Sequence, residues 1–474
     1  MPFDSSYRPE TRHARLGGEF YDVVEAATFP RHVLRRRSQR HAERVGLGQL
    51  TDAEWIAHFG RFEPLPGSFE APLALRYHGH QFRHYNHELG DGRGFLFAQL
   101  RDARDGRLLD LGTKGSGQTP WSRRGDGRLT LKGGVREVLA TEMLEALGVE
   151  TSKSLSLIET GEALVRGDEP SPTRSSVLVR LSHSHIRIGT FQRQAFLGDT
   201  QAIARLLEHA IAEYKPWIPE GPIEARARAF LEDTATRVAR TGARWMTAGF
   251  VHGVLNTDNI NITGESFDYG PWRFAPFYDS QFTAAYFDEQ GLYSFGRQPG
   301  ALAWNLTRLA ECLLPLSSRD EMEKALAVFE PALQREFALS LLRRLGLASA
   351  GEKEDAQFAR AFLAFLETTK APFEQTFFDW HCGMASGERA ASSPSAEHYR
   401  TEAFEAARAR MAEHAIVDEA RLLHPYFQRA TPCTMLIDEV EALWAPIAAA
   451  DDWSAFESKL ADIALMREAC GDAP

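Results

Sequence analysis

The pattern of apolar and polar positions divides the chain into a strand-rich first part and a helical second part. From residue 73 to about residue 179, short apolar runs separated by turn residues predict β-strands. One helix interrupts them, because residues 134–147 place apolar side chains at the spacing of a single helix face and Gly148 is a natural stop. The predicted strands cover residues 95–100, 107–111, 154–159, 163–166 and 176–181.

After about residue 200 the apolar positions follow helical spacing. Pro331 is expected to divide one long segment into two helices, because proline lacks the amide hydrogen that a helix interior needs. Residues 434–467 are periodic as well, with a break expected near Pro446. The predicted helices cover residues 200–214, 223–248, 300–314, 319–347, 355–367 and 397–412. The expected loops cover residues 250–280, 349–353 and 385–396.

This order of elements predicts an α+β fold of two lobes with a cleft between them. Residues 1–50 are irregular in pattern and are expected to form an N-terminal extension. Thr51 and the acidic residues after it are typical of a helix start. We therefore expect a β-rich N-lobe at 51–195, which contains the single helix, and a larger helical C-lobe at 196–474.

Composition narrows the function classes. The 474 residues are 43% hydrophobic and 25% charged, as in an ordinary globular protein. The net charge of −11 argues against binding to nucleic acid or to an anionic membrane surface. No apolar run approaches the roughly 20 residues that a membrane span needs, and no secretory signal is apparent. The four cysteines lack metal-site spacing, so we expect no structural zinc and a reducing, cytoplasmic location.

The most informative stretch runs from His252 to Asn259 and is followed by Asp268-Tyr269-Gly270. It is similar to the protein-kinase catalytic loop H-R-D-L-x-x-x-N and the later metal-binding aspartate. Alignment on Asn259 puts Val254 where the kinase base stands, and valine accepts no proton. A carboxylate reappears at Asp258, so either the chemistry has moved there or there is none. The oxygen-rich set of Asp258, Asn259 and Asp268 suits Mg²⁺ or Mn²⁺ better than zinc.

A second group of residues has the order of a kinase phosphate site. Gly90 and Gly92 lie in a turn before a predicted strand, where backbone amides could approach phosphate, and Arg93 adds a cation. Lys114 follows another strand, and Glu137 lies on the predicted helix, as do the kinase lysine and its glutamate partner. Taken singly, these residues also fit a simple hairpin, a solvated lysine and a surface charge on a helix.

Two more charged segments are candidates. Arg180 and Arg187 flank an otherwise apolar stretch and either form an anion clamp or decorate an edge strand. His183 and His185 lie between them, but further metal ligands are not evident in the sequence. The turn at 122–128 is dense in charge and glycine, and is either a ligand-binding element that protein kinases lack or a polar surface loop.

Together these motifs resemble the selenoprotein O family, the protein adenylyltransferases with a pseudokinase fold. The resemblance covers about residues 75–310. The matching segments are Gly79-His80-Gln81-Phe82, Leu89 to Gly94, Lys114-Gly115-Ser116-Gly117, Thr119-Pro120, Ser122-Arg123, Gly125 to Arg128, Arg136-Glu137, Arg187 with Gly189, Asn256-Thr257-Asp258-Asn259, Asp268-Tyr269-Gly270-Pro271, Gln298-Pro299 and Trp304-Asn305.

The resemblance implies a bilobal, protein-kinase-like fold with its catalytic loop at 252–270, which binds ATP and transfers AMP to hydroxyl side chains of proteins. It implies Asp258 as the proton acceptor, Glu137 as the partner of Lys114, and Asn259 with Asp268 as metal ligands. The residues that it implies around the nucleotide are Gly90, Gly92, Arg93, Lys114, Asp126, Gly127, Arg180, Arg187 and Asp268.

Three alternatives stay open from the residues: transfer of UMP, a true kinase that transfers the γ-phosphate, and a non-catalytic nucleotide-binding scaffold. The chain also departs from the family pattern. Arg83 stands where the family usually has glycine, and the stretch around 424–430 matches poorly. The resemblance implies Cys470 as the position that corresponds to the redox-active residue near the family's C-terminus, although no disulfide partner is evident. The sequence leaves the oligomeric state open.

Overall fold

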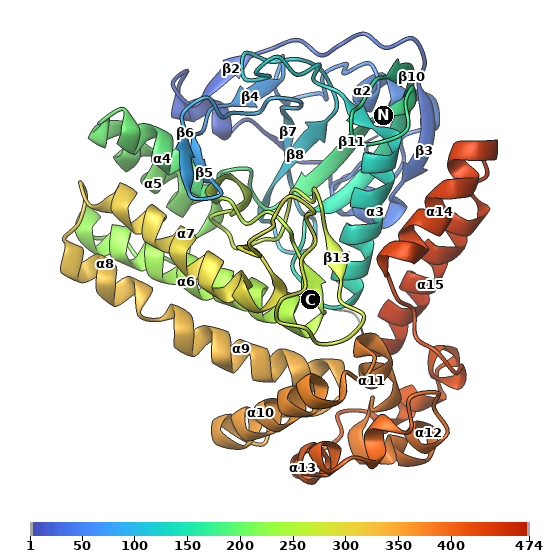
Figure 1. Cartoon of the computed structure of the whole chain (residues 1–474). Helices are drawn as coiled ribbons and strands as arrows, with labels where there is room; N and C mark the ends of the chain where they lie inside the picture. The colour runs from blue at the N-terminus through green and yellow to red at the C-terminus, as the bar shows by residue number, and fades with distance from the viewer. Residues whose placement is uncertain (1–2, 472–474) are drawn as a thin grey trace.

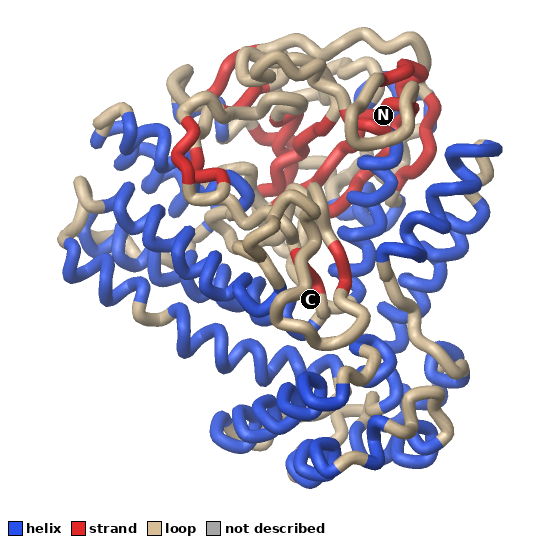
Figure 2. Tube along the Cα trace, viewed as in Figure 1, coloured by secondary structure: helices blue, strands red, loops and turns tan. Residues whose placement is uncertain are grey.

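The computed structural model describes residues 3–471, with the large sheet in one part of the molecule and most of the helices in the other (Figures 1 and 2). A nine-stranded antiparallel sheet fills the first half, in the order β2-β4-β7-β8-β11-β10-β3, with β1 beside β7 and β9 beside β11. Its strands are β1 (Pro9–Glu10), β2 (Tyr21–Val23), β3 (Val33–Arg37), β4 (Leu73–Leu75), β7 (Leu96–Arg101), β8 (Leu108–Lys114), β9 (Leu129–Thr130), β10 (Lys153–Leu164) and β11 (Thr173–Ser182).

Residues 3–50 contribute strands to this sheet. They supply β1, β2 and β3 and the short helix α1 (Gln39–Arg44), and β3 pairs with β10 at one end of the sheet. The predicted helix start at Thr51 is confirmed, because α2 (Asp52–Phe59) begins there with a capping box between Thr51 and Glu54.

One predicted boundary within the sheet is wrong. Residues 154–159 and 163–166 were expected to form two strands, yet they form the single strand β10, which ends at Leu164. An irregularity in its pairing with β11 lies between Glu159 and Ala163, and Gly161 adopts a positive φ of 77° inside it. A local bulge of this kind breaks the apolar alternation that the sequence pattern relied on.

Alternation along the strands decides which side chains reach the site. Leu109 and Leu111 of β8 pack on the sheet face that α2 covers, whereas Leu108 packs on the opposite face. Successive side chains of a strand point to opposite faces, so Lys114 shares the face of Leu108. That face is covered by α3 (Leu131–Ala146), which buries Val135, Val138 and Leu139 and confirms the predicted helix.

The second half is helical, as predicted. Residues 200–214 match α5 fully, and the long segment 319–347 divides into α8 and α9 with Pro331 in the first turn of α9. The helices are α4 (Ile188–Phe196), α5 (Thr200–Tyr214), α6 (Ile223–Thr247), α7 (Gln298–Leu313), α8 (Arg319–Leu326), α9 (Phe329–Arg344), α10 (Glu352–Thr369), α11 (Phe373–Asp379), α12 (Gly387–Ala391), α13 (Glu402–Met411), α14 (Ile437–Ala450) and α15 (Ser454–Cys470).

Some details of the helical half differ from expectation. The break expected near Pro446 is displaced, because Pro446 lies inside α14. The helix ends at Ala450, and the next residue, Asp451, adopts a left-handed conformation. The expected loop 385–396 contains the short helix α12, and α4 and α11 were not anticipated. Helices this short carry too few turns for their apolar spacing to stand out.

The segment between α6 and α7 is mostly irregular, as expected, and lies between the two halves (Figure 2). It holds the two-stranded pair β12 (Phe250–Val251) and β13 (Arg273–Phe274) and the 3₁₀ turn Thr257–Asn259. A second pair, β5 (Gly79–Gln81) and β6 (His84–Asn86), projects from the sheet toward this turn. The His80 amide donates to Thr257 Oγ1 at 2.7 Å, so the two segments are joined directly.

Candidate active site

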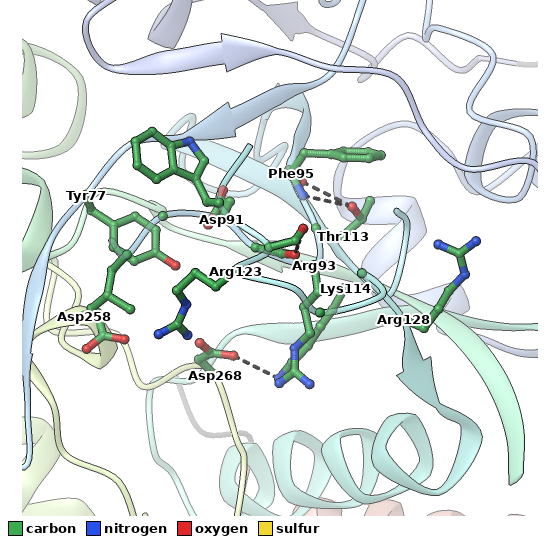
Figure 3. Close-up of a pocket in the computed structure, with 18 of the residues that line it drawn as sticks. Tyr77, Asp91, Arg93, Phe95, Thr113, Lys114, Arg123, Arg128, Asp258 and Asp268 are labelled. Atoms are coloured by element: carbon green, nitrogen blue, oxygen red, sulfur yellow. Dashed lines mark hydrogen bonds and ion pairs between the residues drawn. The ribbon is translucent and has the colours of Figure 1, made fainter. Parts of the chain in front are cut away.

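A cavity of about 680 Å³ lies where the sheet meets the segment between α6 and α7. The glycine-rich turn at 90–94, the end of β8 and the charged turn at 121–128 line it on the sheet side, and Asp258 and Asp268 line it on the other side. Figure 3 shows both carboxylates facing the cavity, with Arg123 between them. Nearly all the residues singled out in the sequence therefore converge on one space.

At the centre of the cavity wall is a buried ion-pair network. Lys114 Nζ lies 2.6 Å from Glu137 Oε2 and 2.9 Å from Asp268 Oδ1. Arg180 Nη1 approaches Glu137 at 3.3 Å and Asp268 at 3.2 Å. Arg180 lies on β11 at a position that faces α3, so strand alternation brings both cations to the helix that carries Glu137. Two cations and two carboxylates balance one another here, which makes the burial of four charges tolerable.

The electrostatic states of the two aspartates differ. Burial would raise the pKa of Asp268, but Lys114, Arg180 and Arg187 outweigh it and hold this pKa well below its usual range. Burial, reinforced by the negative charge of Asp268, raises the pKa of Asp258 to about 6. Asp258 Oδ1 is buried and makes no hydrogen bond within residues 3–471. One carboxylate is thus held as an anion by cations, and the other is poised to exchange a proton near neutral pH.

Arg187 lies beside Asp91 of the glycine-rich turn. Its guanidinium lies 4.1 Å from the ring centre of Tyr77, and Nη2 is 3.5 Å from Asp91 Oδ1. Asp91 is fixed in turn, because its Oδ2 accepts a hydrogen bond from the Leu75 amide at 3.1 Å. The side chain of Arg187 is only 2% exposed, so a buried cation faces the cavity with a rigid orientation.

The glycine-rich turn is shaped by its neighbours. A side chain at Gly90 would meet the ring of Trp121 at 2.3 Å, and one at Gly92 would meet the Trp121 carbonyl at 2.8 Å. Trp121 Nε1 donates to Asp22 Oδ2 on β2 at 2.8 Å, and this bond anchors the 121–128 turn to the sheet. Glycine is required at both positions because the 121–128 turn packs directly against them.

The 121–128 turn itself lines the cavity along its whole length. Arg123 and Arg124 adopt positive φ values of 48° and 76°, and both line the cavity. Asp126 Oδ2 binds Arg166 Nη1 at 2.8 Å, and Arg166 also lines the cavity. Gly127 has a φ of 69° and no room for a side chain against Gly117. Strained arginines are an uncommon choice for a plain surface loop.

Two predicted site residues do not line the cavity: Glu137, which reaches it only through Lys114, and Asn259. Asn259 is partly buried, and its Nδ2 donates to the Val254 carbonyl at 2.9 Å. That bond occupies the amide nitrogen and leaves the oxygen as the atom available to a cation. Within residues 3–471, no three His, Cys, Asp or Glu side chains are grouped as a metal site.

Sequence reasoning missed Tyr77, Asp91 and Arg166, which line the cavity beside the predicted residues. Asp91 lies between Gly90 and Gly92, so its position in the sequence was a usable signal. Nothing in the sequence around Tyr77 or Arg166 indicated a site residue. Cys470 lies away from this cavity as a free thiol, and burial raises its pKa to about 12.

A glycine-rich turn, a buried lysine–glutamate pair, two buried arginines and two unlike carboxylates around one cavity are the features of a site for a phosphorylated ligand. The comparison with protein families makes this class specific. The family model described as protein adenylyltransferase SelO matches residues 4–464, and the chain belongs to that family. The resemblance found in the sequence is confirmed, and the chain is a nucleotidyltransferase.

Similar proteins span nearly the whole chain. A protein named protein nucleotidyltransferase YdiU from Gloeobacter violaceus is 45% identical over 459 residues, which cover 94% of this chain and 93% of the relative. The protein of the same name from Synechocystis is 52% identical over 346 residues, or 72% of each chain. Within the described range, none of the helices combines the length and apolar character that a bilayer span needs.

Proposed function

We propose that this protein is an AMP transferase that uses ATP to modify Ser, Thr or Tyr hydroxyls of other proteins. The observation that carries the proposal is the joint position of Asp258 and Asp268 on one cavity with Lys114, each carboxylate in a different protonation regime. The arrangement supports a kinase-like pair of lobes, with the sheet half as the N-lobe and the helical half as the C-lobe around the loop 252–270.

The phosphates would lie among the cations of the sheet side. The backbone of Gly90 and Gly92, with Arg93, Lys114, Arg180 and Arg187, supplies donors and positive charge, and every one of these residues lines the cavity. Asp126 and Gly127 would shape the 121–128 turn around the same ligand. Glu137 would act by positioning, since it fixes Lys114 at 2.6 Å.

Asp258 would be the proton acceptor. A protein hydroxyl oxygen forms a bond to the α-phosphorus, the bond from that phosphorus to the bridging oxygen of the β-phosphate breaks, and pyrophosphate leaves. The hydroxyl proton passes to Asp258. A carboxylate whose pKa is about 6 is well suited to accept it near neutral pH. Lys114, Arg180 and Arg187 would stabilise the negative charge that develops on the pyrophosphate.

The donor set fits a hard cation such as Mg²⁺ or Mn²⁺. Asp268 would offer a carboxylate held as an anion, and Asn259 an amide oxygen left free by its bond to Val254. When bound, the ion would neutralise charge on the phosphate oxygens. A site completed by nucleotide oxygens needs no cluster of three acidic or histidine side chains.

The test is parallel incubation of the protein and a protein substrate mixture with α-labelled ATP, γ-labelled ATP and α-labelled UTP. Label from α-ATP alone in the substrate supports AMP transfer. Label from the γ-position alone would replace the proposal with a kinase, and stronger labelling from UTP would replace it with UMP transfer. If no label transfers with any of the three nucleotides, although nucleotide binds, the scaffold alternative holds.

A further inference from the structure

A second cavity, of about 300 Å³, lies at the C-terminal end of α3. It is bounded by the residues that end α3 and α9, by α11, and by the end of α15, which converge in the lower part of Figure 1. It shares no lining residue with the active-site cavity. Leu339 and Val417, which are 38% and 63% exposed, lie on its wall, so the cavity opens to solvent.

The charges on its wall do not balance. Arg344 Nη2 pairs with Glu374 Oε1 at 2.5 Å, and Arg421 Nε lies 3.6 Å from Asp418 Oδ2. Arg343 is the third arginine on the wall, and within residues 3–471 no carboxylate lies within ion-pair distance of it. On the wall itself, three cations face two anions. The acids that act on Arg343 from outside the wall, Glu150 and Glu336, form their ion pairs with Arg240 and Arg244 instead.

Arg343 is held in place but poorly compensated. Its Nη2 donates to the Gly148 carbonyl at 3.4 Å, just beyond the end of α3. Burial, together with the neighbouring Arg244 and Arg344, outweighs the more weakly acting Glu336 and Glu150 and lowers the pKa of Arg343 to about 10. A guanidinium stays cationic at that value, so its charge is disfavoured yet persists at neutral pH. An anion in the cavity would remove this penalty.

A second polar group on the wall also lacks a partner. His381 is 1% exposed, and its Nδ1 lies 3.1 Å from the Arg344 carbonyl. A carbonyl only accepts, so Nδ1 carries the hydrogen and Nε2 is left as an acceptor with no partner among the described residues. Burial lowers the pKa of His381 to about 4, which keeps the ring neutral. Nε2 therefore requires a donor.

Most of the rest of the wall is apolar, with Ser349, Tyr426 and Cys470 as the other polar side chains. Leu342, Leu347 and Phe377 line it, and Phe427 stacks on the His381 ring with the ring centres 4.4 Å apart. A compact hydrophobic body fits such walls, and one charge and one donor fix its orientation. We propose that this cavity is a binding site for a small organic monocarboxylate with an apolar body and one hydroxyl group. The carboxylate binds Arg343, and the hydroxyl donates to His381 Nε2.

The location gives the ligand a structural connection to the active site. Arg343 contacts the chain at Gly148, directly after the helix that carries Glu137, and Glu137 fixes Lys114. The binding site itself is independent of nucleotide, because the two cavities have separate walls. Binding of the carboxylate is therefore measurable without the transfer reaction, and it stands or falls separately from the proposed function.

The experiment titrates 4-hydroxybenzoate into the full-length protein and follows binding by saturation-transfer NMR and calorimetry. We expect saturable binding with a dissociation constant of about 1 mM or tighter. The neutral analogue 4-hydroxybenzyl alcohol should bind at least tenfold more weakly, and a saturating non-hydrolysable ATP analogue should not displace the acid. Benzoate, which lacks the hydroxyl, should bind severalfold more weakly than 4-hydroxybenzoate.

Variants assign the binding to the cavity. Arg343→Gln should weaken binding of 4-hydroxybenzoate at least tenfold, whereas Arg343→Lys, which keeps the cation, should stay within a few fold of the parent. The matched control is Arg335→Gln on the exposed side of the same helix, which should bind like the parent. Circular dichroism at each step verifies that the variants are folded.

Three results would overturn the proposal. These are absence of saturable binding to the parent protein, equal binding by the folded Arg343→Gln variant, and displacement of the acid by the ATP analogue. If Arg343→Gln does not fold, the decision passes to Arg343→Lys and to the neutral analogue. Equal affinity for the acid and the alcohol would then refute an anion site.

Discussion

Replacement of Asp258 by asparagine is expected to stabilise the folded protein while it abolishes transfer. The pKa of Asp258 is raised from 3.8 to about 6, chiefly by burial. The sign follows from linkage: the folded state disfavours the ionised carboxylate, so its cost is absent below about pH 4 and complete above about pH 6. A shift of about two pKa units corresponds to about 3 kcal/mol, which is an upper figure for a neutral, isosteric replacement.

The structure supports this magnitude. Asp258 is 9% exposed, and its Oδ1 has no hydrogen-bond partner among residues 3–471, so asparagine breaks no side-chain bond at that atom. Transfer should fall by about 10²–10⁴-fold, the usual contribution of a general base. Active sites commonly keep groups that lower stability because the reaction needs them.

The assay compares urea unfolding of parent and Asp258→Asn protein at pH 8 and pH 4, with chelator present and nucleotide absent. The variant should gain between about 1 and 3 kcal/mol at pH 8 and little at pH 4. Asp320→Asn, a replacement on an exposed helix, is the control and should change stability by less than about 0.5 kcal/mol. Transfer within tenfold of the parent, or equal stability at pH 8, would refute the reasoning.

Three further predictions concern other buried charged or titratable groups. Glu137→Ala leaves Lys114 and Arg180 without their shared buried carboxylate, and it should lower the free energy of unfolding by about 3–5 kcal/mol. The control Lys132→Ala, near the surface of α3, should lower it by less than about 1 kcal/mol. Equal losses in the two variants would contradict this. Arg187→Lys keeps the charge but not the planar fork that stacks on Tyr77, so the KM for nucleotide should rise about tenfold with thermal stability little changed; an unchanged KM in steady-state assays argues against a phosphate contact. His13 is buried, and its pKa is lowered to about 4, mainly by burial. As the pH falls below about 6.5, the unfolded chain takes up this proton first and stability is lost, so His13→Leu should reduce the drop in urea midpoint between pH 7 and pH 5. A variant that is as acid-sensitive as the parent would show that other groups dominate.

The sequence by itself determined the local elements and the identity of the candidate chemistry. Apolar spacing located α3 and α5. α5 buries one continuous face, whereas α3 is buried on nearly all sides. The order of the glycine-rich turn, Lys114, Glu137 and the altered catalytic loop indicated the family before any contact was known, since that order is carried by the chain itself. Where local pattern was weak, as in the bent strand β10 and around Pro446, the predicted boundaries were displaced.

Only the tertiary structure decided which charges meet and which are left alone. The pairing of Lys114 with both Glu137 and Asp268 joins residues up to 154 positions apart, and the unlike pKa values of the two aspartates arise from that convergence and from burial. Asp91 and Tyr77 also lie at the site because folding brings them to the cavity. The uncompensated Arg343 is likewise invisible in the sequence, because a charge is unpaired only with respect to neighbours that folding brings close, and periodicity along the chain carries no record of them.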